Sequence, residues 1–291
     1  MTAPKININD VTFGIEIETC LPRGLIQVGG YHNGLQIPGL PEGWLAERDG
    51  SIRCTRRYEP CEVVSPVLKG ADGIKQIIQI LDWLRTNNAR VNSSTGLHIH
   101  VGWNHGEKET CRLVTTVANF EKAIFASTGT RARETGSFCN PIKTSTLHRQ
   151  RYNEGTLPES ARPTSRYHVL NLVPLSREAN KRTIEFRAFA GTLNKTKVLG
   201  YIRLCLGLVE KALSTTRAPQ WEAKQPAETS PIHRAGAGQT ELNRLFYFLG
   251  WTKGREAHTF GNITCEGAPK VTTCKKELMR LAKKYDAETT N

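Results

Sequence analysis

The sequence predicts an α+β fold with a largely antiparallel sheet that is apolar on one face and carries charged and metal-binding side chains on the other. Three short segments, residues 13–18, 96–102 and 183–189, alternate apolar residues with polar ones. Residues two apart in a strand share a face, so the polar side chains of each segment lie together. A doubly wound parallel sheet would instead have nearly continuous apolar strands. Strand-like and helical segments are interspersed along the chain, which is typical of an α+β protein.

The first half of the chain contains further expected elements around these strands. Residues 21–44 are rich in glycine and proline, and we expect a long binding loop or lid there. Residues 58–68 are expected to form a strand, with Glu62 and Val64 on one face. Apolar stripes at helical spacing predict two helices. The first has Ile74, Ile77, Ile78, Leu81 and Leu84, and the second has Leu113, Val114, Val117, Phe120 and Ile124.

The second half is less regular. Residues 129–163 are polar and basic without a clean period, so we expect a loop or a partly ordered insertion. Residues 166–175 and 182–189 are expected to be two strands joined by a hairpin turn of the longer kind. A third helix is predicted by the apolar positions Val198, Ile202, Cys205, Leu208 and Val209.

These elements predict a chain of three parts. Residues 1–213 would form the main domain, and they contain every expected strand. Residues 214–240, rich in Ser, Thr, Pro, Ala and Gly, would be a linker. Residues 241–291 would form a small helical appendage.

The chain is strongly basic. Lys and Arg number 40 against 27 Asp and Glu, a formal net charge of +13. This balance favours an anionic partner, which could be nucleotide phosphates, an acidic polypeptide or nucleic acid. One basic cluster is Arg131, Arg133, Lys143, Arg149 and Arg151, and a second is Lys275, Lys276, Arg280, Lys283 and Lys284. Neither cluster is interleaved with aromatic residues as a single-strand stacking groove would be, and the second could be the solvated face of a terminal helix.

Cysteine usage and the N-terminus point to a soluble cytoplasmic protein. The eight cysteines include no C-x-x-C pair, which argues against zinc-ribbon and thioredoxin-like sites. We expect mostly reduced thiols. Residues 1–10 lack the apolar core of a secretory signal, and the longest apolar segments are too short and too charged to span a bilayer.

The polar positions of the expected strands predict a metal and phosphate site. They are Glu16, Glu18, Glu62, His98, His100, Glu185 and Arg187. Clustered carboxylates raise one another's pKa, and divalent cations balance their charge more simply than protonation does. Four carboxylates carry a formal charge of about −4, which two Mg²⁺ ions would cancel, and Mg²⁺ prefers oxygen ligands. His98 could complete one metal shell and Arg187 could hold a phosphoryl group, a combination that indicates phosphoryl transfer.

Each pattern alone has a simpler interpretation. A Glu-x-Glu pair is often the solvated face of an edge strand, and a His-x-His pair is often structural. Glu185 and Arg187 could form a surface ion pair. All three pairs alternate with apolar residues in short strand-like segments, and this joint appearance favours a shared site. The sequence contains no G-x-x-x-x-G-K-[ST] loop, no G-x-G-x-x-G after a strand, no H-E-x-x-H and no G-x-S-x-G, so bound ATP would lie on a metal-lined sheet.

Six motifs, in their order along the chain, resemble those of the amidoligases. They are FGIEIE (13–18), DGSI (49–52), CEVVSP (61–66), GLHIHVG (96–102), RYHVLNL (166–172) and TIEFRAFAGTLN (183–194). Amidoligases are small relatives of glutamine synthetase and glutamate–cysteine ligase in the carboxylate–amine ligase superfamily. The resemblance covers residues 11–210 and implies a glutamine-synthetase-like curved, mostly antiparallel sheet with helices on its outer face. It also implies an ATP- and Mg²⁺-dependent enzyme that forms an amide, peptide or isopeptide bond through an acyl phosphate.

The resemblance implies a role for each candidate residue. Metal ligands would be Glu16, Glu18, Glu62, His98 and Glu185. Arg187 would clamp a phosphate, and Arg166 stands where a second phosphate-binding arginine is expected. Asp49 would bind or deprotonate the amine, although an Asp-Gly turn would also explain it. His100 would bind nucleotide or support His98.

Two other functions remain open at this point. The chain could be a basic protein that binds nucleic acid or an acidic partner without ligase activity, in which case binding would be steeply salt-dependent and indifferent to ATP. It could also be a hydrolase with a histidine–carboxylate transition-metal site. For the ligase, the carboxylate and the amine could each be a small molecule, a peptide or a protein, and the oligomeric state is open.

Overall fold

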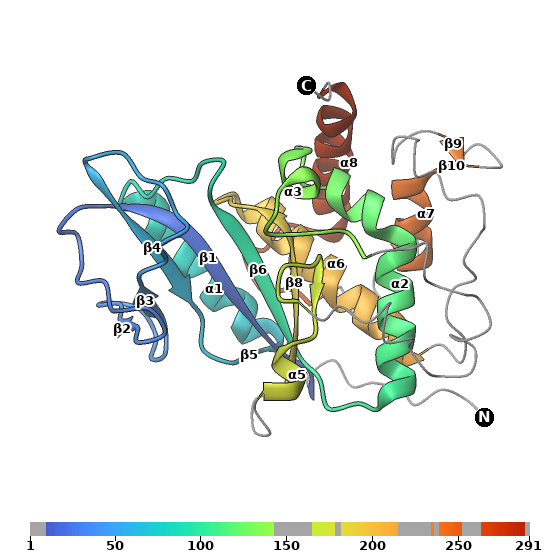
Figure 1. The fold of residues 1–291 in the computed structure, drawn as a ribbon, viewed down its shortest axis with the longest axis horizontal. Coiled ribbons are helices and arrows are strands. Elements are labelled where there is room, and N and C mark those ends of the chain that lie inside the picture. Colours follow the sequence, from blue (N-terminus) through green and yellow to red (C-terminus); the bar gives the residue numbers. More distant parts are fainter. Residues whose placement is uncertain are drawn as a thin grey trace.

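A computed structural model describes residues 10–142, 165–177, 182–214, 234–235, 239–251 and 263–288. Its main feature is an eight-stranded sheet in the order β2-β3-β4-β1-β6-β8-β7, with β5 paired to β1 (Figure 1). All of these pairings are antiparallel. The strands are β1 (Thr12–Pro22), β2 (Leu35–Gln36), β3 (Leu45–Glu47), β4 (Tyr58–Val64), β5 (Leu68–Lys69), β6 (Gly96–Gly102), β7 (Leu170–Asn171) and β8 (Thr183–Ala190). The predicted α+β class is therefore confirmed.

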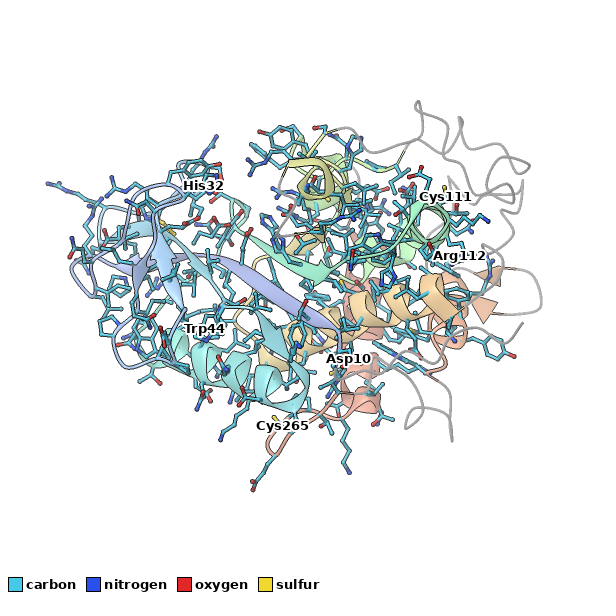
Figure 2. The ribbon with its side chains drawn as sticks, turned by 90° about the horizontal axis from the view of Figure 1, so that it is seen from below. Asp10, His32, Trp44, Cys111, Arg112 and Cys265 are labelled. Atoms are coloured by element: carbon cyan, nitrogen blue, oxygen red, sulfur yellow. A yellow bond between two sulfur atoms is a disulfide. The ribbon has the colours of Figure 1, made fainter. Side chains whose placement is uncertain are left out.

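Helices cover the apolar face of this sheet. They are α1 (Gly70–Thr86), α2 (Glu107–Ala126) and α6 (Lys195–Ser214). Two short helices, α3 (Ala132–Thr135) and α5 (Pro174–Arg177), lie in the connections between the longer elements. Figure 2 shows α1 and α6 on the same side of the strands. The buried side chains of β1 (Phe13, Ile15 and Ile17) belong to the same hydrophobic core as those of α1 and α6. Since alternate residues of a strand face opposite sides, this burial directs the glutamates of β1 to the open face.

The C-terminal part of the chain adds two longer helices and a small ribbon. These are β9 (Arg234–Ala235), β10 (Gln239–Thr240), α7 (Glu241–Phe248) and α8 (Val271–Ala287). Helix α7 contacts α2, and α8 contacts both α2 and α6. Their buried residues Leu242, Leu278 and Leu281 join the main hydrophobic core. Within the residues that the structure describes, no helix combines the length and the apolar character needed to cross a membrane.

The expectation of a strand at residues 166–175 was wrong over most of that range. Only Leu170–Asn171 pair with β8, and residues 174–177 form helix α5. Asn171 accepts a hydrogen bond from the backbone N–H of Val173, 2.9 Å away, which turns the chain out of the sheet. The predicted loop at 129–163 is described only as far as residue 142 and contains α3. Most of the predicted linker, and residues 178–181 of the predicted turn, lie outside the described residues. The division into three parts remains a prediction.

Candidate active site

His98 lies at the centre of the open face of the sheet, surrounded by carboxylates. Its Nδ1 atom is 3.1 Å from Glu16 Oε2, 3.4 Å from Glu185 Oε1 and 3.9 Å from Glu62 Oε1. Its Nε2 atom is 3.5 Å from Glu18 Oε1. Strand register produces this arrangement, because Glu16 pairs with His98 and Glu18 pairs with Glu62. All five residues predicted as metal ligands therefore come together.

Arg187 shares the open face with Glu185 by regular alternation, and a β-bulge follows directly after it in β8. Leu97 pairs with Phe189 and Ile99 pairs with Phe186, so two residues of β8 lie opposite the single residue His98. A bulge of this kind re-aims the side chains around it. Arg187 forms an ion pair with Glu185 on the open face, while Phe189 is buried in the core and stacks on Tyr201.

Glu185 is held from both sides. Its Oε1 accepts a hydrogen bond from Arg187 Nη1, and its Oε2 accepts a 2.5 Å hydrogen bond from Asn171 Nδ2. Glu18 is similarly oriented, since its Oε2 accepts the backbone N–H of Gly96 at 2.5 Å. Fixed carboxylates of this kind are typical of ligands that are oriented before a cation binds.

The carboxylates form overlapping sets that could each hold a cation. The sets are Glu16, Glu62 and His98; Glu16, His100 and Glu185; and Glu18, Asp49 and Glu62, with ligand atoms within 4.8 Å of one another in each. Two of the sets share Glu62, and two share Glu16. The donors are mainly carboxylate oxygens, which suit a hard cation such as Mg²⁺.

The electrostatics of the cluster favour a bound cation. Burial and then the charges of Glu16 and Glu18 raise the pKa of Glu62 well above its usual range. Burial also acts to raise the pKa of Glu16, but the nearby His100 and His98 hold it well below its usual range. Glu185 is held low in the same way by the two histidines and Arg187. Protonation therefore leaves much of the negative charge in place, and a divalent cation would neutralise it.

The other predicted residues lie around the same cavity of about 1020 Å³. Asp49 is half-buried, and its Oδ1 also accepts the backbone N–H of Ser51 at 2.6 Å, as in an Asp-Gly turn. Arg166 is exposed at the cavity, where its Nη1 donates to the Tyr31 hydroxyl at 3.3 Å. His100 Nε2 lies 3.0 Å from Glu16 Oε1.

Sequence reasoning missed three residues that line or support this cavity. Glu47 pairs with Glu62 across β3 and β4 and is buried, and burial raises its pKa. Asn171 holds Glu185. Arg133 lines the cavity from α3. Asn171 lies within the motif RYHVLNL, which was a usable signal, whereas Glu47 and Arg133 lie in segments without a period.

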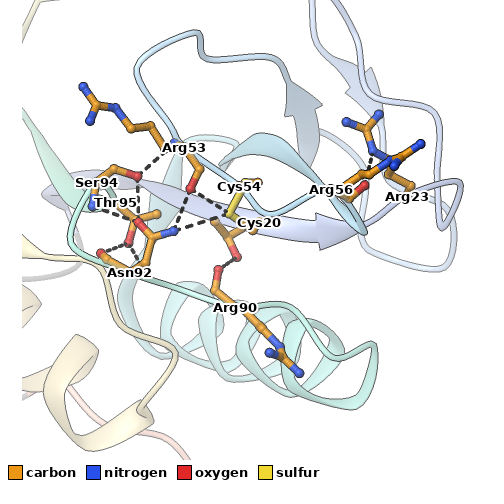
Figure 3. Close-up of a disulfide and its surroundings, with 10 residues drawn as sticks. Cys20, Arg23, Arg53, Cys54, Arg56, Arg90, Asn92, Ser94 and Thr95 are labelled. Carbon is orange, nitrogen blue, oxygen red and sulfur yellow. Dashed lines mark hydrogen bonds between the residues drawn. A yellow bond between two sulfur atoms is a disulfide. The ribbon is translucent and has the colours of Figure 1, made fainter.

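One disulfide fastens the loop that carries Asp49 (Figure 3). Cys20 of β1 is bonded to Cys54, and the other six cysteines are free, so the expectation of mostly reduced thiols missed this pair. Neighbouring hydrogen bonds reinforce the link: Asn92 Nδ2 donates to Arg53 O at 2.8 Å, and Arg53 N donates to Ser94 Oγ at 2.9 Å. The two cysteines are 34 residues apart, and no sequence motif marks them as partners.

Reducing this disulfide is expected to lower the free energy of unfolding. A cross-link spanning 34 residues restricts the unfolded chain, and its loss should destabilise the fold by about 4 kcal/mol. The measurement is guanidinium unfolding of the wild type with and without a reductant, compared with Cys54→Ser. Cys265→Ser is the control, because Cys265 is a free and partly exposed thiol. Equal unfolding midpoints with and without the reductant would contradict the assignment.

The His100–Glu16 pair should make the stability of the metal-free protein depend on pH. Burial acts to lower the pKa of His100, but Glu16 more than compensates and raises it to about 9. Unfolded histidine titrates near a pKa of about 6.5, so the pair stabilises the fold fully below that pH, and the contribution is lost as pH rises through about 9. We expect a decrease of about 3 kcal/mol in the free energy of unfolding. Denaturant titrations in chelator would measure it. A Glu16→Gln variant with the same pH slope would disprove this origin.

An antiparallel sheet with a cavity of carboxylates, histidines and an arginine on its open face defines an α+β protein with a candidate metal and phosphate site. The chain belongs to the amidoligase family: the family model described as "Putative amidoligase enzyme" matches residues 31–209. Strand β1, with Glu16 and Glu18, precedes the matched residues. No protein of curated function matches the chain.

Among solved structures, the chain is similar to one described as the complex between prokaryotic ubiquitin-like protein Pup and its ligase PafA. The two share 10% sequence identity with a TM-score of 0.43. The similarity covers 96% of this chain and 64% of that chain.

Proposed function

We propose that this protein is an ATP- and Mg²⁺-dependent carboxylate–amine ligase that acts through an acyl phosphate. The observation that carries the proposal is the convergence of Glu16, Glu18, Glu62 and Glu185 around His98, beside Arg187 and in one cavity. Membership of the amidoligase family supports the bond-forming chemistry. The volume of the cavity, about 1020 Å³, suits a nucleotide together with a second substrate.

The acidic residues would bind the metal ions, and the arginines would bind the phosphates and substrates. The carboxylates and His98 would hold Mg²⁺, which supplies charge neutralisation and alignment of the phosphates. Arg187 would bind the phosphoryl group that is transferred, since its Nε has no hydrogen-bond partner within the described residues. Asn171 would keep Glu185 in place. Arg166, exposed beside Tyr31, would meet the outer part of the substrates.

The proposed reaction has two steps. A carboxylate oxygen of the acid substrate attacks the γ-phosphorus of ATP, the bond to the bridging oxygen breaks, and ADP leaves. The amine nitrogen of the second substrate then attacks the acyl carbon, phosphate leaves with the former carboxylate oxygen, and the nitrogen gives up a proton. Asp49, next to Glu18 and Glu62, is the proposed acceptor of that proton.

The test is the fate of the carboxylate oxygen. The full chain is incubated with ATP, Mg²⁺ and pools of amines and of carboxylates that carry a heavy-oxygen label, and mass spectrometry follows the condensed product and the phosphate. We expect label in the released phosphate, an amide product and no turnover in chelator. Glu42→Gln, an exposed acid that is not among the cavity residues, is the matched control and should behave as the wild type. ATP hydrolysis without transfer of label would overturn the proposal.

A further inference from the structure

Arg133 is a second arginine that reaches the cavity, from helix α3. Its Nη2 donates a 2.6 Å hydrogen bond to the backbone carbonyl of Arg187. Both Nη atoms lie over Gly96, where a Cβ atom would be 3.2 Å from Nη2 and 3.3 Å from Nη1. A side chain at this position would crowd the guanidinium, so the glycine gives Arg133 room above β6.

The Nε donor of Arg133 has no acceptor within the described residues. Within the described part of the chain, the buried Nε atoms of both Arg133 and Arg187 lack a hydrogen-bond acceptor. Two neighbouring guanidiniums repel each other, and a buried donor without an acceptor is unfavourable. An anion with several oxygens in the cavity that both residues line would offset this repulsion and offer acceptors to guanidinium N–H groups. A phosphoryl group has this chemistry, and guanidinium groups match its geometry.

The C-terminal end of α8 holds the segment that carries Arg133. The backbone N–H of Arg131 donates to Glu288 Oε2 at 2.6 Å, and Arg131 Nε donates to the Glu288 carbonyl at 2.9 Å. The Thr130 hydroxyl lies 3.3 Å from Glu288 Oε1. The Arg131 guanidinium also stacks on the ring of Tyr285, 4.5 Å from its centroid.

A second group of contacts secures the other side of α3. Glu134 accepts hydrogen bonds from the Tyr285 hydroxyl and from Lys122 of α2. Gly129, in the turn before α3, has a φ of +79°, and a Cβ there would lie 2.7 Å from Leu281 of α8. Figure 1 shows α3 beside the C-terminal half of α8. Arg133 is therefore flanked in sequence by two residues, Arg131 and Glu134, that are both bound to α8.

We propose that Arg133 binds the terminal phosphoryl group of the nucleotide and that α8, through Tyr285 and Glu288, positions it. The inference rests on the proposed function and extends it to residues 271–288, which lie beyond the family match at 31–209. Arg133 would contact the substrate, whereas Tyr285 and Glu288 are positioning residues. In this proposal the C-terminal helix α8 contributes to the site by orienting Arg133.

The experiment compares two nucleotides by calorimetric titration of the full chain in Mg²⁺. The probes are ADP and an ATP analogue with a non-hydrolysable β,γ-imido bridge. Arg133→Ala should weaken binding of the triphosphate analogue about a hundredfold and leave ADP within about twofold. Tyr285→Phe and Glu288→Ala should each cause the same selective loss, about tenfold. Lys283→Ala, an exposed residue of α8, is the control and should change neither affinity.

Further combinations separate positioning from general instability. In the Arg133→Ala background, Glu288→Ala should cause no further loss of triphosphate affinity, because the group it positions is absent. Arg133→Lys should restore part of the selectivity. The inference would be overturned if Arg133→Ala weakened the binding of both nucleotides equally. It would also be overturned if Glu288→Ala lowered the melting temperature but kept the wild-type preference for the triphosphate analogue. In either case the ligase proposal would stand. A wild type that binds neither nucleotide would instead overturn the proposed function, and the inference with it.

Discussion

Replacing Glu185 by glutamine is expected to lower ATP turnover about a thousandfold at saturating Mg²⁺ and ATP. Glu185 is the point at which three strands meet: it forms an ion pair with Arg187 of β8, accepts a hydrogen bond from Asn171 of β7, and lies 3.4 Å from His98 of β6. Glutamine has nearly the same shape but no charge. The substitution therefore removes a proposed cation ligand and leaves the Arg187 guanidinium without its carboxylate.

The measurement is steady-state phosphate release, with circular dichroism and the melting temperature recorded for each variant. Glu16→Gln should have a comparable effect, because Glu16 belongs to two of the three possible cation sets. Glu42→Gln should keep full turnover and the same melting temperature. Folded Glu185→Gln protein with turnover within tenfold of the wild type would show that the carboxylate does not serve catalysis.

Replacing Arg203 by leucine is expected to lower the free energy of unfolding by about 5 kcal/mol. Arg203 is fully buried in α6, with 0% of its surface exposed. Its Nε and Nη2 donate to the carbonyl of Ile263 at 3.3 and 3.0 Å, and its Nη1 donates to the carbonyl of Pro269 at 2.5 Å. Leucine would leave both carbonyls without these donors in the protein interior, so the segment that leads into α8 would lose its attachment.

Guanidinium unfolding followed by circular dichroism measures this change. Arg112→Leu is a matched control, since Arg112 of α2 also donates to a backbone carbonyl, that of Ala212, but is partly exposed. We expect that variant to lose about 1 kcal/mol. A loss in Arg203→Leu no larger than in Arg112→Leu would contradict a structural role for the buried arginine. Because α8 also supports Arg133, Arg203→Leu should in addition weaken binding of the triphosphate analogue.

Alternation in the sequence was sufficient to predict which side chains share the open face of the sheet. In β1 the buried Phe13, Ile15 and Ile17 leave Glu16 and Glu18 on the other side, as the period of two requires. The apolar stripe at residues 74–84 likewise predicted helix α1. These signals are local, since each depends on the burial of one face of one element.

The same reasoning could not predict positions that depend on two distant segments. The bulge opposite His98 directs Phe189 to the core although its spacing from Glu185 and Arg187 would place it on the open face. The pairing of Cys20 with Cys54 depends on how a loop returns to β1. The strand expected at 166–175 is limited to Leu170–Asn171, and the Asn171 side chain accepts the backbone N–H of Val173 where the chain turns toward α5.

The amino-acid sequence by itself determined the antiparallel sheet, its apolar face and the set of carboxylates and histidines that the open face carries. The reason is that the alternation of buried and open residues in a strand is visible in the local sequence. The tertiary structure alone decided that Arg133 enters the cavity, since this residue lies in a segment without a period and is placed by contacts with α8, about 150 residues later in the chain. Long-range packing of this kind depends on the relative positions of whole elements, which no local pattern specifies.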